Sequence, residues 1–350
     1  MNCLFVRSVV LTIFSLGACT VIPAQERDLL IGASLPLTGP NAAAGQEGLA
    51  VANAVFESVN KAGGIHGRRI VLKALDDGFN PQTAAANARR LSEDKVLALF
   101  NCWGTSSCSA MMPVVNEQKV AMIAGIAGGG IMQADPGRYA FNVRPTTEHE
   151  IRRMVSQMTT VGQRNIAVVY QADGFGQGGL ISARSALSKA GIKPSRELAL
   201  EADAVNAGAV IAELRKAEAN GVILIASPAP TVKLISQARQ TGMATPFYNL
   251  AAQANQKVVA DLGKHTQGAI FTTLVPSPWR IQLPVAKEYQ QLYSAATGKI
   301  DYSYIGLEVF INATLLVEGL RGAGRDPSRQ SLIAALETME KKTYGGMSVK

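Results

Sequence analysis

The sequence predicts an α/β protein of two lobes, each built on a parallel sheet, joined by a hinge with a ligand cleft between them. Its 350 residues exceed the usual size of a single hydrophobic core. Apolar segments of strand length alternate with helical patterns in two successive series, which is typical of parallel α/β sheets. Prolines interrupt this alternation near Arg144-Pro145 and again at Val275 to Pro278. An apolar fraction of 47% excludes a disordered chain.

These interruptions divide the chain. We expect residues 25–145 and 276–342 to form lobe 1, and residues 146–275 and 343–350 to form lobe 2. Residues 1–24 read as a signal peptide, with Arg7 in its basic region and the apolar run Val9 to Leu16 too short to span a bilayer. Cleavage after Ala24 is favoured, and a lipobox-like sequence ending at Cys19 leaves a lipid anchor as the alternative.

The first series begins with an apolar strand and a long helix. In that helix Leu49, Ala52, Val55, Phe56 and Val59 recur with helical spacing. The helix ends at a Gly-Gly pair, as helices do where a residue takes a positive φ. Strands are predicted at 29–35, 69–76, 96–100 and 120–125, and helices at 43–61, 82–93 and 109–117.

The second series repeats the pattern and is followed by a helical tail. Strands are predicted at 166–170, 199–201, 222–226, 246–250 and 269–274, and helices at 180–190, 207–219 and 231–241. The tail is predicted to be helical over 284–295, 307–320 and 328–340. Ligands of such sheets bind beyond the carboxyl ends of the strands, so the cleft between the lobes is the expected site.

One turn in the first series is suited to an anion. The buried run Val96 to Phe100 leads through the hydroxyl-rich turn Gly104 to Ser107 into a helix. Backbone N–H groups and a helix N-terminus converge there, and Thr105 and Ser106 add hydroxyl donors, so a carboxylate is a suitable ligand. The alternative is that the hydroxyls only cap the helix. The next loop, Ile126-Ala127-Gly128 and two further glycines, leaves its backbone open to a ligand.

Cysteines and histidines limit the chemistry. Cys102 and Cys108 are six residues apart, and in an exported chain we expect them to form a disulfide. The three histidines are scattered without ligand spacing, so no metal site is predicted. We also expect no cofactor.

Charge and composition argue against nucleic acid as a partner. The net charge of +8 is spread over short segments, whereas nucleic-acid binding needs a dense basic stripe. Aromatic residues make up only 6% of the chain, so stacking surfaces are scarce. A mildly basic surface is still compatible with an anionic ligand in a cleft.

An enzymatic interpretation has one motif in its favour. Residues 174–179 read G-x-G-x-x-G after a strand, with Glu197 about 20 residues further on, which is the dinucleotide-binding pattern. Three residues separate that strand from the first glycine, and Asp173 would place a negative charge beside a pyrophosphate. The sequence contains no nucleophile elbow and no zinc signature of a hydrolase. We therefore predict that the protein is not an enzyme and assign no catalytic residue.

Several separate motifs resemble type I periplasmic binding proteins, and most closely the branched-chain amino acid-binding proteins of ABC importers. The motifs are 31–39, 60–68, Asp76-Asp77, 81–84, 169–176 and 302–308. The resemblance runs from about Leu29 to the last residue. It implies a periplasmic protein that acts as a monomer, captures a small amino acid-like or carboxylate solute by hinge closure and delivers it to a membrane permease. A sensor module of the same fold is the alternative.

The resemblance also implies site residues. On lobe 1 these are Thr105, Ser106, Ile126, Ala127 and Gly128, and on lobe 2 Phe175. Three further residues are candidates for the cleft apart from the resemblance: Trp103, for which core packing is the alternative, Ser227 and Gln253. Gly128 replaces a ligand-facing hydroxyl of relatives, and residues 251–253 lack the carboxylate that holds an amino acid's ammonium. Carboxylates, aromatic acids and amides are therefore candidate solutes. The chain stops at Lys350 where relatives continue, so we expect a shortened C-terminus.

Overall fold

A computed structural model describes residues 28–39, 41–128, 137–254 and 256–339, together with the backbone of 342–344 and 347–349. The predicted signal peptide, with Cys19, lies outside the described residues. So do the two glycines that follow Gly128. Within the described part of the chain, no helix is both long and apolar enough to cross a membrane.

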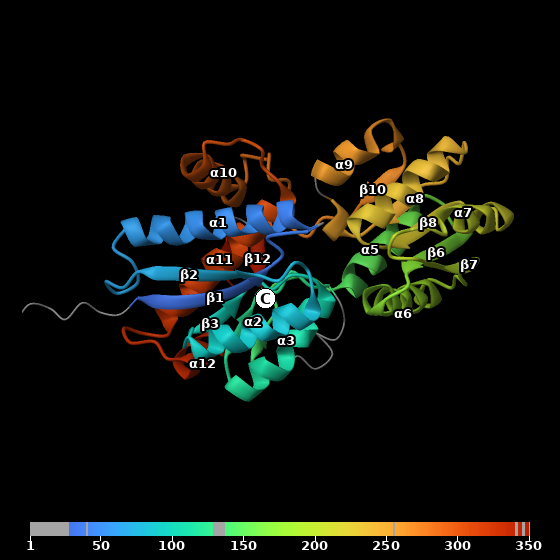
Figure 1. The fold of residues 1–350 in the computed structure, drawn as a ribbon. Helices are drawn as coiled ribbons and strands as arrows, with labels where there is room; N and C mark the ends of the chain where they lie inside the picture. The colour runs from blue at the N-terminus through green and yellow to red at the C-terminus, as the bar shows by residue number, and fades with distance from the viewer. Residues whose placement is uncertain are drawn as a thin grey trace, which may run out of the picture.

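The first sheet has five parallel strands, in the order β2-β1-β3-β4-β5 (Figure 1). Its strands are β1 (Leu29–Leu35), β2 (Ile70–Asp76), β3 (Ala98–Phe100), β4 (Ala121–Ile123) and β5 (Ala140–Phe141). The three described strands that follow β2 are only two or three residues long. Even so, β3 and β4 are completely buried, as expected of the centre of a parallel sheet.

The second sheet is also five-stranded and parallel, in the order β10-β9-β8-β6-β7. Its strands are β6 (Ile166–Gln171), β7 (Arg196–Leu200), β8 (Gly221–Ile225), β9 (Phe247–Asn249) and β10 (Ala269–Phe271). Two separate parallel sheets, each accompanied by helices, confirm the predicted fold class.

Helices cover both sheets. Those of the first lobe are α1 (Ala42–Lys61), α2 (Pro81–Glu93), α3 (Thr105–Gln118), α10 (Pro284–Thr297), α11 (Tyr304–Gly322) and α12 (Arg329–Glu337). Those of the second lobe are α5 (Thr147–Thr160), α6 (Gly174–Lys189), α7 (Ala207–Lys216), α8 (Pro228–Gln240) and α9 (Gln256–Leu262). In Figure 1 the orange-red helices near the C-terminus return to the blue N-terminal lobe.

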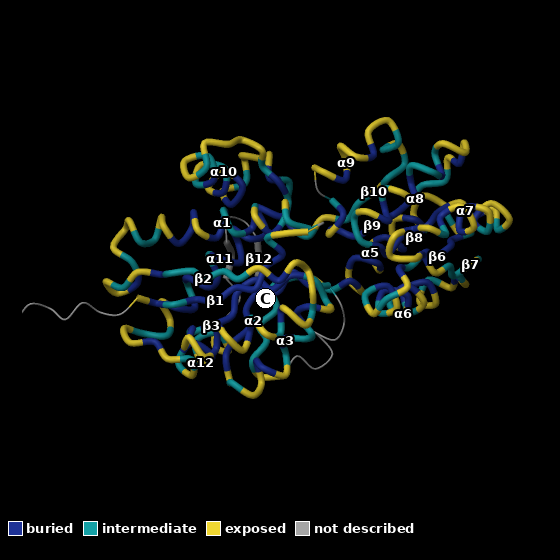
Figure 2. Tube along the Cα trace, viewed as in Figure 1, coloured by how far each residue is buried: buried dark blue, intermediate teal, exposed yellow. Residues whose placement is uncertain are grey.

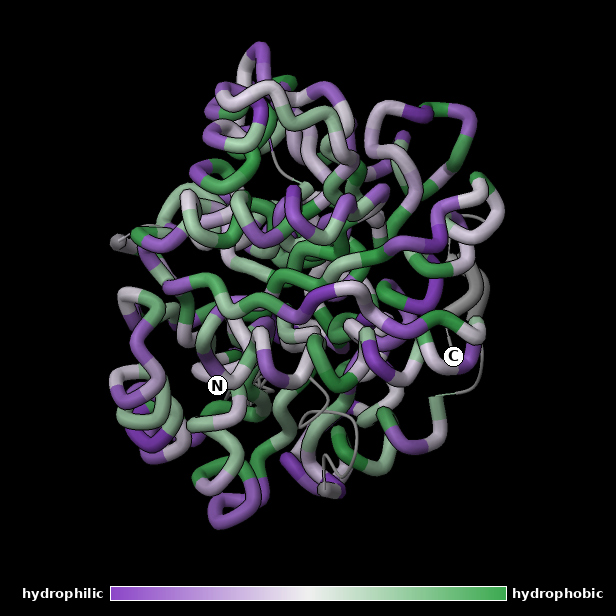
Figure 3. Tube along the Cα trace, turned by 90° about the vertical axis from the view of Figure 1, so that its right-hand side faces the viewer, coloured by the Kyte–Doolittle hydropathy of each residue, from purple (hydrophilic) through white to green (hydrophobic). Residues whose placement is uncertain are grey.

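The hydrophobic core follows the strands and the inner helix faces. In Figure 2 the central strands β1, β3, β6 and β8 are mostly dark blue, and the exposed stretches lie along outer loops and helix faces. Figure 3 shows the same division as a green interior with purple at the periphery. Helix α11 is buried along most of its length because it packs against α1, α10 and α12.

The chain passes between the lobes after β5 and again after β10. Helix α5 packs on α6 in the second lobe, and α10 packs on α1 in the first. Strands β11 (Lys342–Tyr344) and β12 (Met347–Val349) pair only with each other. Strand pairing therefore gives no support for placing residues 343–350 in lobe 2, and that part of the domain division remains a prediction.

Four helices differ clearly from expectation. Helices α5 and α9 were not predicted, although Ile151, Met154, Val155 and Met158 bury one helical face of α5. Helix α6 begins at Gly174, six residues earlier than expected, because the side chain of Asp173 accepts a hydrogen bond from the N–H of Gly176 at 2.9 Å. Helix α3 begins at Thr105 rather than 109.

Candidate ligand-binding site

A cavity of about 150 Å³ lies between the two lobes and is lined by residues of both. All nine residues singled out from the sequence line it: Trp103, Thr105, Ser106, Ile126, Ala127, Gly128, Phe175, Ser227 and Gln253. The sequence interpretation missed other residues of the lining, among them Asn41, Phe79, Arg144, Gln171, Asp173 and Ile305.

The first lobe contributes the loops that follow β3 and β4. These loops are hydrogen-bonded to each other: the N–H of Gly104 donates to the carbonyl of Ile126 at 3.0 Å, and the N–H of Ile126 donates to the carbonyl of Cys102 at 2.7 Å. Trp103 and Ile126 also form a parallel bridge. The two predicted lobe-1 segments therefore form one backbone surface.

Gly104 sets the direction in which α3 begins. Its φ is +83°, which glycine adopts without strain, and a Cβ there would lie 2.7 Å from the ring of Phe79. Gly104 is the N-cap residue and has no side chain to cap the helix. Thr105 and Ser106 are the first helical residues, so neither of them is the N-cap residue. The N–H groups of the first turn have no acceptor within the helix. They point out of its N-terminus, which is the positive end of the helix dipole.

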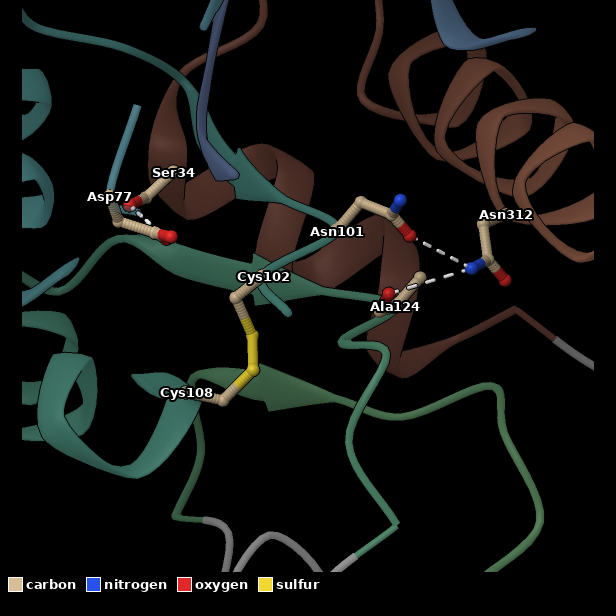
Figure 4. The surroundings of a disulfide bond; sticks show 7 residues. All are labelled: Ser34, Asp77, Asn101, Cys102, Cys108, Ala124 and Asn312. Atoms are coloured by element: carbon tan, nitrogen blue, oxygen red, sulfur yellow. Dashed lines mark hydrogen bonds between the residues drawn. A yellow bond between two sulfur atoms is a disulfide. The ribbon is translucent and has the colours of Figure 1, made fainter. Parts of the chain in front are cut away.

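A disulfide and an amide pair hold this turn in place (Figure 4). Cys102 after β3 is bonded to Cys108 in the second turn of α3, with their Cα atoms 5.6 Å apart. Asn101 adopts a positive φ of 60°, and its Oδ1 accepts a hydrogen bond from Nδ2 of Asn312 on α11 at 3.0 Å. The start of α3 is thus tied both to its own strand and to the C-terminal helices.

The second lobe contributes a chain of polar side chains. The Oε1 atom of Gln171 accepts from the N–H of Ser227 at 2.8 Å, and its Nε2 donates to Asp173 at 2.6 Å. Gln253 is 1% exposed; its Nε2 donates to the carbonyl of Ala226, while its buried Oε1 has no hydrogen-bond partner. This side of the cavity therefore offers acceptor atoms, opposite the donors of the first lobe.

Two charged residues line the cavity without having been predicted there. Asp173 is a carboxylate on the second lobe, although the segment 251–253 has none. Arg144 lies in the first segment that crosses between the lobes, and its Nε is 3.4 Å from Oε1 of Glu308. Burial raises the pKa of the Glu308 carboxyl, and the positive charge of Arg144 acts in the opposite direction. The sequence offers a signal for Asp173, which is a typical N-cap residue directly before a helix. It offers none for Arg144, which lines the cavity because of the tertiary fold.

The glycine-rich segment does not form a nucleotide loop. Residues 174–179 are the first six residues of α6. A Cβ on Gly176 would lie 1.9 Å from the carbonyl oxygen of Gln171, and one on Gly179 would lie 2.6 Å from Ile225. These glycines therefore allow α6 to pack closely against the sheet. Within the described ranges, no group of three or more His, Cys, Asp or Glu residues could hold a metal ion.

Comparisons with known proteins agree with this architecture. The family model described as "Periplasmic binding protein" matches residues 29–349. The chain is 24% identical to the Leu/Ile/Val-binding protein homolog 3 of Brucella melitensis, covering 89% of this chain and 84% of that protein. It is also 24% identical to the leucine-, isoleucine-, valine-, threonine-, and alanine-binding protein of Pseudomonas aeruginosa, covering 88% and 82% of the two chains.

Solved structures share the fold. A substrate-binding periplasmic protein from Ralstonia solanacearum is 25% identical, with a TM-score of 0.83 and 91% of each chain covered. A possible leucine/isoleucine/valine-binding protein from Rhodopirellula baltica gives a TM-score of 0.85 at 24% identity, covering 94% of this chain and 90% of that one. Two lobes in this arrangement are thus a recurrent architecture.

Proposed function

The chain belongs to the periplasmic binding protein family, and within that family we propose that it is the solute-binding component of an ABC importer. The family and the fold are those of substrate-binding proteins rather than enzymes. Beyond family membership, we propose that the protein is exported to the periplasm, acts there as a monomer, binds a small solute and delivers it to a membrane permease.

The solute we propose is small and carries a carboxylate. The observation that supports it is the N-terminus of α3 at the interlobe cavity, with Thr105 and Ser106 in its first turn. A helix N-terminus carries about half a positive charge, and its N–H groups are suited to an anion. The cavity has a volume of about 150 Å³. An engineered apolar cavity of about that volume binds benzene, so a ligand portion about as large as benzene fits here.

A second polar contact would come from the other lobe. Relatives are named for binding leucine, isoleucine, valine, threonine and alanine. An α-ammonium group in this cavity would find the carboxylate of Asp173 rather than a residue at 251–253. Amino acid-like solutes thus stay within the proposal, together with plain carboxylates.

Capture would proceed by hinge closure. The lobes are linked by the segments after β5 and β10, and rotation about such links is a common way to enclose a ligand. Phe175, Ser227 and Gln253 would then cover a solute already held on the first lobe. Binding would rely on oriented donors and on exclusion of water, with no covalent step.

A thermal-shift screen of the purified protein tests this proposal. The compounds are α-amino acids, aliphatic and aromatic carboxylates, and amides. A ligand at about 1,000 times its Kd stabilises the folded state by roughly 4 kcal/mol, a rise of several degrees in Tm. Stabilisation by carboxylates or amino acids supports the proposal. A well-folded protein that responds only to amides or to a nicotinamide dinucleotide overturns it.

A further inference from the structure

A second and larger cavity adjoins the first. Its volume is about 460 Å³, three times that of the cavity at α3. The two cavities share four lining residues: Asn41, Ala44, Pro228 and Ile305. The two cavities therefore adjoin at these residues.

The walls of the second cavity come from both lobes. On the first lobe it follows α1 from Ala44 to Ala50, where six steps of about 1.5 Å make about 9 Å along the helix. On the second lobe it is bounded by Pro228, Ala229 and Val232 of α8 and by Val258 of α9. These small and apolar side chains suit a flexible hydrocarbon chain, and polar and charged residues line the rest of the cavity.

Two acidic side chains in this cavity, Glu47 and Asp301, form no ion pair among the described residues. Glu47 projects from α1, and its Oε1 accepts a hydrogen bond from the hydroxyl of Ser303. Among the described residues, Glu47 makes no ion pair and its Oε2 accepts no hydrogen bond. Burial raises the pKa of its carboxyl. Lys299 is near enough to lower the pKa of this carboxyl but forms no salt bridge with it, so a ligand ammonium could pair with Glu47 directly.

The other charged residues of the cavity differ in how they affect Glu47. Asp261 is paired with Lys257 at 2.8 Å. Asp301, like Glu47, accepts a hydrogen bond from a hydroxyl, that of Tyr293 at 2.9 Å, and its negative charge adds to that of Glu47, whereas Lys299 opposes it. Glu47 lies about one helical turn after Ala44, which lines both cavities, so we take Glu47 as the acceptor for a cation that enters from the first cavity.

We propose that the solute is elongated: its carboxylate lies at the N-terminus of α3, its hydrocarbon chain passes into the second cavity, and an amino group at its far end pairs with Glu47. This inference rests on the proposed function and narrows it from small carboxylates to ω-amino carboxylates. A compact α-amino acid would occupy the first cavity alone.

Isothermal titration calorimetry with acids of increasing length tests the inference. The probes are 4-aminobutanoate, 6-aminohexanoate and 8-aminooctanoate, with butanoate, hexanoate and octanoate as matched acids without the amino group. We expect affinity to rise with length, and the two longer amino acids to bind at least about tenfold more tightly than their plain counterparts, as a charged hydrogen bond provides. Glu47→Gln should remove that advantage and leave octanoate binding unchanged, since its Oε1 can still accept from Ser303.

A second variant checks the path of the chain. Ala229→Trp places a large ring in the second cavity without altering the first, and should weaken 8-aminooctanoate at least about tenfold while leaving butanoate unchanged. The inference is overturned if butanoate binds and the longer acids bind more weakly. It is also overturned if Glu47→Gln leaves the affinity for the ω-amino carboxylates unchanged. Absence of binding by every carboxylate overturns the proposed function as well.

Discussion

Arg144 and Glu308 form a buried ion pair between the first segment that links the lobes and helix α11. Their side chains are only 6% and 9% exposed, and Nε of Arg144 lies 3.4 Å from Oε1 of Glu308. Glu150 on α5 is near enough to repel the charge of Glu308. The pair therefore lies where the first lobe, the second lobe and the ligand cavity meet.

Removing one member of this pair should destabilise the protein strongly. Glu308→Met leaves the Arg144 cation buried without its counter-charge, and we expect the free energy of unfolding to fall by about 3–5 kcal/mol in urea denaturation. The double variant Arg144→Met/Glu308→Met removes both charges and should recover most of that loss. A double variant no more stable than Glu308→Met would show that the two residues contribute independently.

The hydroxyl of Thr105 should strengthen ligand binding without affecting folding. Thr105→Val keeps the shape of the side chain but removes the donor, and should weaken carboxylate binding about 10- to 100-fold, the effect of a hydrogen bond to a charged group. Thr105→Ser keeps the hydroxyl and should remain near wild type. Titration calorimetry measures both affinities, and a Tm within about 2 °C of wild type confirms that folding is intact. Equal affinities of all three proteins would count against the proposed carboxylate position.

The disulfide should contribute to both stability and binding. The two cysteines are six residues apart in sequence, so the bond closes a short loop. For such a loop the chain-entropy relation gives a stabilisation of about 2 kcal/mol. Cys102→Ala/Cys108→Ala should therefore lower the free energy of unfolding by about that amount. Ligand affinity should fall too, because the bond holds the first turn of α3 against β3. Reduction of the wild-type protein should reproduce the effect, while the double variant should not respond to reductant.

Two adjacent aspartates should give opposite pH dependences. Asp77 is buried, and burial raises its pKa above the ordinary value of 3.8. Asp76 is exposed, and the hydroxyl of Thr38, 2.6 Å away, leads the hydrogen bonds that lower its pKa. The contribution of Asp77 to stability is complete below pH 3.8 and is lost as pH rises through its folded-state pKa. That of Asp76 is present above pH 3.8 and is lost as pH falls through its folded-state pKa.

Neutral substitutions measure these contributions separately. Relative to wild type, Asp77→Asn should become more stable as pH rises from 4 to 7. Asp76→Asn should become less stable relative to wild type as pH rises from about 2 to 5. Urea denaturation across this range measures both differences, and curves of the same sign for the two variants would contradict the assignment.

Much of the fold and the candidate site could be predicted because the signals are local. The strand ending at Phe100 is read from a short apolar run, and the turn at Thr105 from the residues directly after it. Parallel topology brings the ends of such strands to one edge, so residues from both lobes could be expected to converge. Such local signals predicted the family and the two parallel sheets, and the family model and the structure confirmed both.

Other features depended on tertiary contacts that no local pattern contains. Phe79 lines the cavity because its loop bends toward Gly104, and Arg144 because a linking segment passes beside α11. The start of α6 was misjudged because glycine normally weakens a helix, whereas here Asp173 caps it and close packing requires Gly176. Helix α5 is an exception, because Ile151, Met154, Val155 and Met158 recur with helical spacing and could have predicted it.

Gly128 offers a final test, because it lies at the cavity and packs directly against helix α5. A Cβ at Gly128 would lie 2.4 Å from Oγ1 of Thr147, the first residue of α5, whose N–H donates to the carbonyl of Gly128 at 2.9 Å. Thr147 is buried and β-branched, so its hydroxyl cannot move aside freely. Gly128→Ala should therefore cost about 1–3 kcal/mol of stability, as overpacking does, and weaken ligand binding.

The double variant Gly128→Ala/Thr147→Ala removes the clashing oxygen and should be more stable than Gly128→Ala, despite carrying a second substitution. The single variant Thr147→Ala gives the change in stability caused by loss of the hydroxyl alone. Urea denaturation of the three variants and the wild type completes a double-mutant cycle, and a coupling energy of at least about 0.5 kcal/mol is expected for residues in contact. Additive effects would mean that the loop after β4 relaxes around the new methyl group, and that the glycine here is not required by Thr147.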